Sequence, residues 1–120
     1  ISLFNGENLE GWEGDTEGYA AENGVMVCKP GGNIYTASSF KNFVFRFEFK
    51  LPPAGNNGLG IFLQPGDKDG AFDAIELQIL DDGHEKYATI EPYQTHGSVY
   101  GIAPAKRGFL KPVGEWNEQE

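Results

Sequence analysis

Apolar and polar residues alternate most clearly over residues 43–50, which read F-V-F-R-F-E-F-K. The four phenylalanines share one side of the alternation, and the other side carries Arg46 and Glu48. Because successive side chains of a strand point to opposite faces, the pattern predicts a β-strand whose phenylalanine face is buried.

Two further segments, 59–64 and 74–80, show the same period of two. Their apolar positions predict the face that packs on the core, and these are Leu59, Ile61, Leu63, Ile75, Leu77 and Ile79. The intervening positions carry mostly polar residues or glycine, and these are Gly60, Phe62, Gln64, Glu76 and Gln78. A carboxylate and a carboxamide side by side on the outer face of a strand are candidates for chemistry.

The remaining pattern predicts short strands over 25–29, 34–37 and 97–103. Asn23-Gly24 precedes the first of them, and this dipeptide is typical of a two-residue hairpin turn. Strands that recur every 8–14 residues, with no helical period longer than two turns, predict an all-β sandwich. The 17 glycines, seven prolines and 13% aromatic residues favour the same class. At 120 residues, a single domain spanning the whole chain is expected.

Charge restricts the partners of the protein. Nine basic and eighteen acidic residues give a net charge of −9, which disfavours nucleic acid and anionic membrane surfaces but not a neutral ligand. No apolar run approaches the roughly 18 residues needed to span a bilayer. The chain holds one cysteine, Cys28, so no intrachain disulfide is expected.

The outer faces of the three alternating segments suggest a candidate site. If these strands are neighbours, the following side chains cluster within roughly 10 Å: Arg46, Glu48, Phe62, Gln64, Glu76 and Gln78. Acids and amides bind sugar hydroxyls in pairs, and aromatic rings stack on the C–H faces of sugars, so this set indicates a carbohydrate site. The alternative is a solvated outer face that holds an Arg–Glu pair.

Motifs for other chemistry are missing from the sequence. There is no G-x-S-x-G, G-x-x-x-x-G-K-[ST] or H-E-x-x-H segment. Asp67, Asp69 and Asp73 do not follow the spacing of an EF-hand, so neither a metal nor a cofactor is predicted. His96 lies among aromatic residues and has either a site role or a structural, hydrogen-bonded role.

Several segments resemble one known family, in order along the whole chain. They read L-F-N-G-E-N-L-E-G-W, N-N-G-L-G-I, I-E-L-Q-I-L-D-D, Y-Q-T-H-G-S-V-Y-G-I-A-P-A-K-R-G and K-P-V-G-E-W-N. They are similar to the family of domain of unknown function 1080, also called 3-keto-disaccharide hydrolase. The resemblance implies a concanavalin A-like jelly-roll sandwich, glycoside-directed hydrolase activity, and a secreted, periplasmic or cell-surface location.

The resemblance also implies site residues. Carried over block by block, they are Glu76, Gln78 and Asp81 in E-x-Q-x-x-D, Asn57 in N-N-G-L-G-I, His96 in H-G-S-x-Y-G, and Lys111, Glu115 and Trp116 in K-P-x-G-E-W-N. Related sequences often carry Arg where this chain has Phe62, which removes an expected charged contact. The family also continues past W-N, so the chain is expected to cover about two-thirds of the domain and to expose a strand edge that can pair with another chain.

Three functions follow from these observations. In the first, a glycoside hydrolase acts on 3-keto-disaccharides or glycosides with Glu76 or His96 as base, or with Glu76 and Glu48 as a carboxylate pair. In the second, a carbohydrate-binding module or lectin uses the same surface without chemistry, through Gln78, Gln64, Arg46 and Trp116. In the third, an interaction domain leaves that face solvated. A sandwich fold hosts all three, so the fold alone does not decide among them.

Overall fold

The computed structural model describes residues 1–29, 32–63 and 74–120. Within these ranges the secondary structure consists of antiparallel β-strands and short 3₁₀ turns, with no α-helix. No helix in these ranges has the length and apolar character to cross a bilayer. The contacts divide the chain into an N-terminal unit, Ile1–Phe43, and a C-terminal unit, Val44–Glu120. That the chain forms a single domain stays a prediction.

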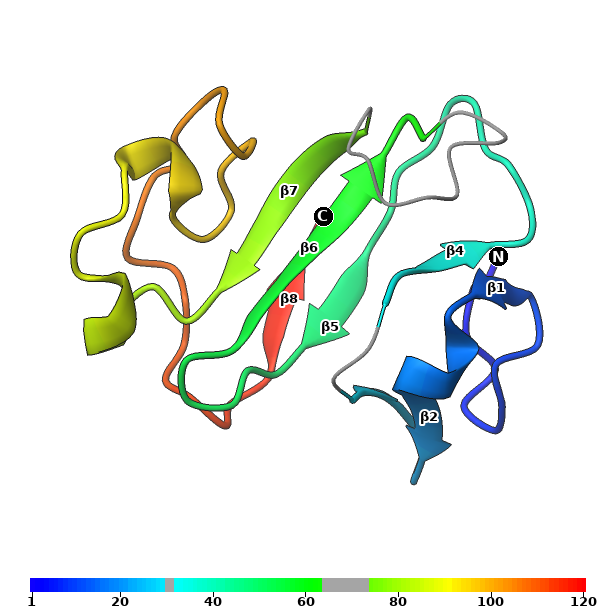
Figure 1. Cartoon of the computed structure of the whole chain (residues 1–120). Helices are drawn as coiled ribbons and strands as arrows, with labels where there is room; N and C mark the ends of the chain where they lie inside the picture. The colour runs from blue at the N-terminus through cyan, green and yellow to red at the C-terminus, as the bar shows by residue number, and fades with distance from the viewer. Residues whose placement is uncertain (30–31, 64–73) are drawn as a thin grey trace. The chain divides into compact units, whose positions relative to one another are not determined.

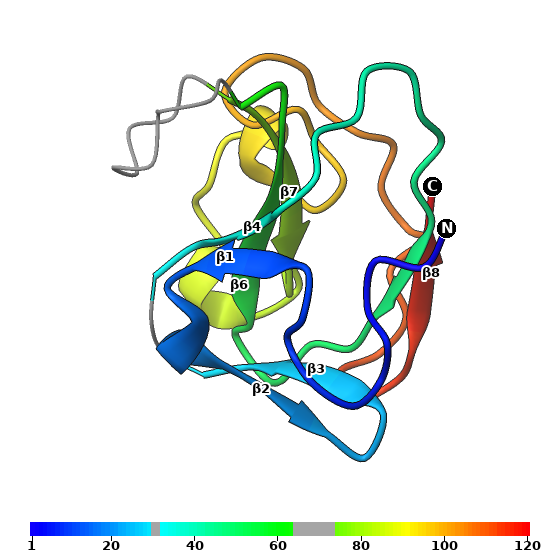
Figure 2. The same cartoon turned by 90° about the vertical axis from the view of Figure 1, so that its right-hand side faces the viewer.

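The N-terminal unit contains two short ladders. Strand β1 (Trp12–Gly14) pairs with β4 (Ile34–Thr36), and the 3₁₀ turn η1 (Thr16–Gly18) leads from β1 to β2. Strands β2 (Tyr19–Glu22) and β3 (Val25–Cys28) form a hairpin, and they lie side by side in Figure 2. Asn23 and Gly24 have φ angles of 53° and 81°, which confirms the predicted two-residue turn.

In the C-terminal unit, β6 (Asn56–Ile61) pairs antiparallel with β7 (Ile75–Leu80), as Figure 1 shows. Leu59 lies opposite Leu77, and Ile61 lies opposite Ile75, so the apolar residues share one face as predicted. On the other face Gly58 lies opposite Gln78, and Gly60 lies opposite Glu76. The polar side chains of β7 therefore have only glycines directly across the ladder.

The second edge of β7 pairs with residues 96–100 through a β-bulge. Gly97 donates to the Gln78 carbonyl at 2.8 Å, whereas the Gln78 amide donates to Ser98 at 3.0 Å. Gly97 and Ser98 thus both lie opposite Gln78. Gly97 has a φ of 79°, the left-handed conformation that this kind of bulge requires of its first residue. A Cβ at residue 97 would also lie 3.3 Å from the Ala105 Cβ.

Strand β5 (Phe47–Phe49) is shorter than the predicted strand 43–50, and it pairs with β8 (Asn117–Gln119). The site hypothesis assumed that 43–50 and 59–64 are neighbours in one sheet. Instead the hydrogen-bonded pairs are β5–β8 and β6–β7. Residues 117–119, N-E-Q, carry no apolar alternation, so no local pattern predicts this partner strand.

A compact turn brings β8 to β5. The Asn117 side chain is 6% exposed and accepts a hydrogen bond from the Lys111 amide at 2.8 Å. Gly114 donates to the Leu51 carbonyl at 3.0 Å, which fixes the turn to the end of β5. The K-P-V-G-E-W-N segment is therefore a structural corner.

The core of the C-terminal unit lies around the ends of β6 and β7, where Leu51, Ile79, Leu80 and Tyr87 are buried. The strand β6 follows a turn at Ala54, which has a φ of 56°. Asp81 accepts from the Ala54 amide at 2.9 Å, and the hydroxyl of Tyr87 donates to the Ala54 carbonyl at 2.9 Å. These bonds hold an uncommon backbone conformation in place. Tyr87 comes from the 3₁₀ turn η2 (Glu85–Tyr87), and η3 (Pro92–Gln94) follows it.

Candidate functional site

Glu76 lies in β7 with its carboxylate leaning over β6. A Cβ built on Gly58 would overlap Glu76 Oε1 and would lie 2.7 Å from its Cδ and 2.8 Å from its Cγ. The acidic side chain thus fills the space that a side chain at position 58 would take. Burial raises the pKa of the Glu76 carboxyl above its usual value. A carboxyl shifted in this direction holds its proton more readily and is a stronger base when ionised.

Gln78 neighbours Glu76 on the same face of β7, two residues along the strand. It is 4% exposed, and its Oε1 atom has no hydrogen-bond partner among the described residues. Buried polar atoms are nearly always paired, so an orphan acceptor of this kind calls for a donor from outside the described chain. A sugar hydroxyl is such a donor.

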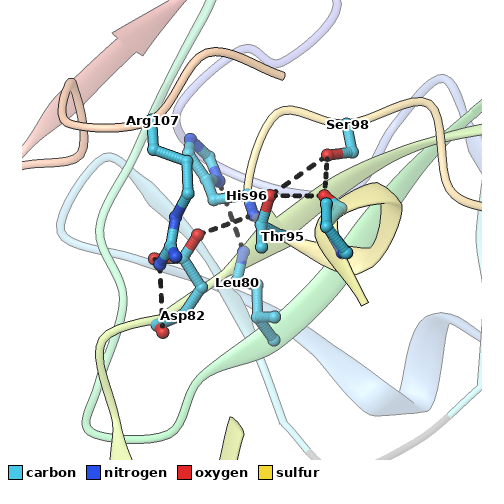
Figure 3. Close-up of polar contacts among 7 residues, drawn as sticks. Leu80, Asp82, Thr95, His96, Ser98 and Arg107 are labelled. Carbon is cyan, nitrogen blue, oxygen red and sulfur yellow. Dashed lines mark hydrogen bonds and ion pairs between the residues drawn. The ribbon is translucent and has the colours of Figure 1, made fainter. Parts of the chain in front are cut away.

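His96 lies in a polar network at the end of β7 (Figure 3). Its Nδ1 accepts a hydrogen bond from the Leu80 amide at 3.3 Å, and its own amide donates to Asp82 Oδ2 at 3.0 Å. A backbone amide can only donate, so the neutral ring carries its proton on Nε2. Burial lowers the pKa of His96, while the Asp82 charge raises it to a lesser extent. The ring of Phe49 lies 5.2 Å away.

Asp82 joins this network to Arg107, which is far from it in the sequence but close in space. Its Oδ1 lies 3.1 Å from Arg107 Nη2, and the Asp82 side chain is 13% exposed against 59% for Arg107. The carboxylate thus bridges the guanidinium and the backbone of His96, as Figure 3 shows. Thr95 and Ser98 are buried on either side of the bulge and share a hydrogen bond of 3.3 Å.

Arg46 and Glu48 lie on the other ladder. Arg46, just before β5, forms an ion pair with Glu120, just after β8, and Glu48 lies opposite Glu118. Within the described ranges, no hydrogen bond or ion pair links this group to Glu76 or Gln78. The structure therefore brings together Glu76 with Gln78, and separately Arg46 with Glu48.

Among the other predicted binding residues, Asn57 and Asp81 lie away from the Glu76 face. Asn57 lies opposite Ile79, on the apolar side of the β6–β7 ladder, and its Oδ1 accepts from the Gly58 amide at 2.7 Å. Asp81 is 8% exposed and clamps Ala54, so it holds a turn. A binding role for either residue stays a prediction.

Lys111 and Trp116 lie together in the corner before β8. The Lys111 ammonium donates to the Trp116 carbonyl at 2.8 Å, and the Lys50 ammonium lies 5.1 Å from the centre of the Trp116 ring. Trp116 is 40% exposed, so its ring is partly accessible. Gln64 and the aspartates at 67, 69 and 73 lie outside the described residues. Across residues 1–29, 32–63 and 74–120, no three acidic, histidine or cysteine side chains group into a metal site.

A comparison with protein families decides the relationship of this chain. The model of the 3-keto-alpha-glucoside-1,2-lyase-like domain matches residues 1–120. The chain belongs to this family. Among curated proteins, none matches the chain.

Two solved structures support the family assignment. Both are crystal structures of presumed glycosyl hydrolases from Parabacteroides distasonis, with TM-scores of 0.87 and 0.86 and sequence identities of 30% and 28%. Each match covers 98% of this chain but only 59% or 60% of the solved one, so the chain spans about three-fifths of their length. The family member described here has the all-β jelly-roll fold of these relatives.

Sequence reasoning missed three residues of the polar network and bulge around His96, which are Asp82, Arg107 and Gly97. Asp82 was visible only as the end of the D-D pair, and its partner Arg107 lies 25 positions further along the chain. Gly97 was predicted as the start of a strand. A glycine inside an otherwise strand-like run is a signal for a bulge, and that signal was present at H-G-S.

Proposed function

We propose that this chain acts on 3-keto-glycosides and that Glu76 is its general base. The observation that carries the proposal is the position of Glu76: a half-buried carboxylate lies over Gly58, beside a buried amide oxygen that has no partner among the described residues. The family assignment supports a glycoside as that ligand.

The chemistry follows from the acidity that a ketone gives to its neighbouring carbon. Glu76 removes the proton from C2, beside the 3-keto group, and the electrons of that C–H bond pass to the ketone as an enolate, from which they form a C1=C2 double bond only as the C1–O bond breaks. The leaving oxygen then takes up a proton. Water subsequently adds its oxygen to C1 and its proton to C2. Positioned acid–base groups contribute roughly 10²–10⁴-fold each.

The neighbouring residues have supporting roles in this proposal. Gln78 accepts a hydrogen bond from a sugar hydroxyl through its Oε1, which has no partner within residues 1–29, 32–63 and 74–120. His96 is unsuited to the role of base, because its Nδ1 is occupied by the Leu80 amide and its Nε2 bears the proton. Its Nε2–H is instead a donor.

Turnover of 3-keto-trehalose by Glu76→Gln tests the proposal. Glutamine keeps the shape of the side chain but cannot take a proton, so we expect the rate to fall by roughly 100-fold or more. Glu48→Gln is the matched control, because Glu48 lies on the solvated β5–β8 ladder, and it should retain activity within about twofold. Equal rates for the parent and Glu76→Gln would refute a general-base role.

The Gln78 oxygen, without a partner in the described part of the chain, also favours a second candidate, a sugar-binding module without catalysis. The same experiment separates the two functions. Saturable binding of 3-keto-trehalose by the parent protein, with no product after prolonged incubation, would support the binding module and exclude the enzyme.

A further inference from the structure

An exposed tyrosine stands next to the backbone of Glu76. The Tyr100 amide donates to the Glu76 carbonyl at 2.9 Å, and Leu77 forms a bridge with Val99. The bulge at Gly97 sets this pairing. Tyr100 is thus fixed at the edge of β7, on the side away from β6.

The Tyr100 ring is held in place although it is 40% exposed. Its hydroxyl accepts a hydrogen bond from Gln94 Nε2 at 2.9 Å. Gln94 is itself fixed, because its Oε1 accepts from the Glu91 amide at 2.9 Å and its amide donates to the Glu91 carbonyl at 2.8 Å. The hydrogen bond from Gln94 restricts the ring before a ligand binds, which reduces the side-chain entropy that binding costs.

The backbone around Tyr100 is equally fixed. Ile102 donates to the Val99 carbonyl at 2.9 Å, and Gly101 has a φ of 72°, so Tyr100 and Gly101 are the central residues of a type II turn. Gly101 also donates to the Tyr93 carbonyl at 3.2 Å. Tyr93 is 39% exposed, so two accessible aromatic residues lie at this edge.

Tyr100 lies on the opposite side of β7 from the Glu76 carboxylate, and so away from the carbon that Glu76 deprotonates in the proposed reaction. The Glu76 carboxylate leans over β6, whereas Tyr100 pairs with the opposite edge of β7. Neighbouring strands lie about 4.8 Å apart, so the carboxylate and the tyrosine are on the order of 10 Å apart across the sheet. This span exceeds the width of one sugar ring.

We propose that Tyr100 is a specificity-determining residue that stacks on the second sugar unit of a disaccharide substrate, next to the unit that loses its proton to Glu76. This inference rests on the proposed function. A half-exposed aromatic ring suits the C–H face of a pyranose, and its hydroxyl accepts a hydrogen bond from Gln94 that orients the ring for stacking.

The test compares two substrates that differ only in the second unit, 3-keto-trehalose and methyl 3-keto-α-glucoside. We expect Tyr100→Ala to raise KM for the disaccharide about tenfold, because the loss of one stacked ring weakens binding by roughly a factor of ten. The kcat value should stay within about threefold of the parent. KM for the methyl glycoside should stay within about twofold. Tyr100→Phe keeps the ring and should resemble the parent for both substrates.

Ile102→Ala is the matched control, because Ile102 is 71% exposed in the same turn. It should leave both KM values unchanged. If Tyr100→Ala raises KM equally for both substrates, the inference is overturned and Tyr100 has a structural role. If Tyr100→Ala fails to fold, Tyr100→Leu supplies the comparison, because it keeps apolar bulk but lacks the flat ring. Absence of turnover by the parent protein on both substrates would instead reject the proposed function.

Discussion

The two ladders of the C-terminal unit carry similar side chains in different surroundings. On β5–β8, the Arg46 and Glu120 side chains are 78% and 58% exposed, and Glu48 and Glu118 also face solvent. On β6–β7, Glu76 is half-buried over glycine, and Gln78 is almost fully buried. Both faces look alike in the sequence, as polar residues that alternate with apolar ones.

The difference shows that burial, more than residue type, makes a carboxyl suitable for chemistry. Water screens the exposed charges of β5–β8, so pairs such as Arg46–Glu120 contribute about 0–1 kcal/mol. Glu76 has lost part of its water, and its pKa is raised for that reason. Gly58 is part of this arrangement, because any side chain at position 58 would displace the Glu76 carboxylate.

Of the three substitutions that test this comparison, Gly58→Ala should have the largest effect. The new Cβ would overlap the Glu76 carboxylate and force it to move, so we expect activity on 3-keto-trehalose to fall by up to about 100-fold. Gly60→Ala is the matched control, because its Cβ would meet only the Ala74 Cβ at 3.7 Å. If both variants retain the parent rate, the position of the carboxylate over Gly58 is unimportant.

A smaller effect is expected from His96→Leu, which removes the acceptor of the buried Leu80 amide. The free energy of unfolding at pH 7 should fall by about 1–3 kcal/mol, measured by urea denaturation. The parent should lose stability as the pH falls below about 6.5, because the unfolded chain binds a proton there before the folded His96 does. In His96→Leu the free energy of unfolding should decline less steeply below this pH. The same pH dependence in the parent and the variant would contradict the buried position assigned to His96.

The smallest effect is expected on the β5–β8 ladder. Arg46→Ala removes an exposed ion pair and should change the free energy of unfolding by no more than about 1 kcal/mol. Raising the salt concentration should reduce even this difference. A much larger loss of stability would show that the two ladders differ less than we argue.

Local patterns predicted much of the fold. The Asn23-Gly24 turn, the alternation over residues 74–80 and the shared face of Glu76 and Gln78 all follow from neighbouring residues. The pairing of β5 with β8 does not, because residues 117–119 lack any apolar period and are held by the Asn117 side chain. Long-range pairing of this kind depends on closing a loop of many residues, on which local pattern carries no information.

The candidate site was predicted in part for the same reason. The spacing placed Glu76 beside Gln78, but grouping them with Arg46 and Glu48 needed strand order, which the alternation does not encode. The ion pair of Asp82 with Arg107 joins residues far apart in the chain, and the backbone pairing of Tyr100 with Glu76 follows the bulge at Gly97. A single glycine in a strand-like run was the only local sign of that arrangement.

The most direct test of the account is the pKa of Glu76 itself. It can be measured by following the side-chain carboxyl carbon in an NMR titration, with the resonance assigned by its loss in Glu76→Gln. The account predicts a midpoint above the usual glutamate value of 4.5, because the folded carboxyl is partly desolvated. A midpoint at or below 4.5 would contradict the claim that this face of β7 prepares Glu76 for acid–base chemistry.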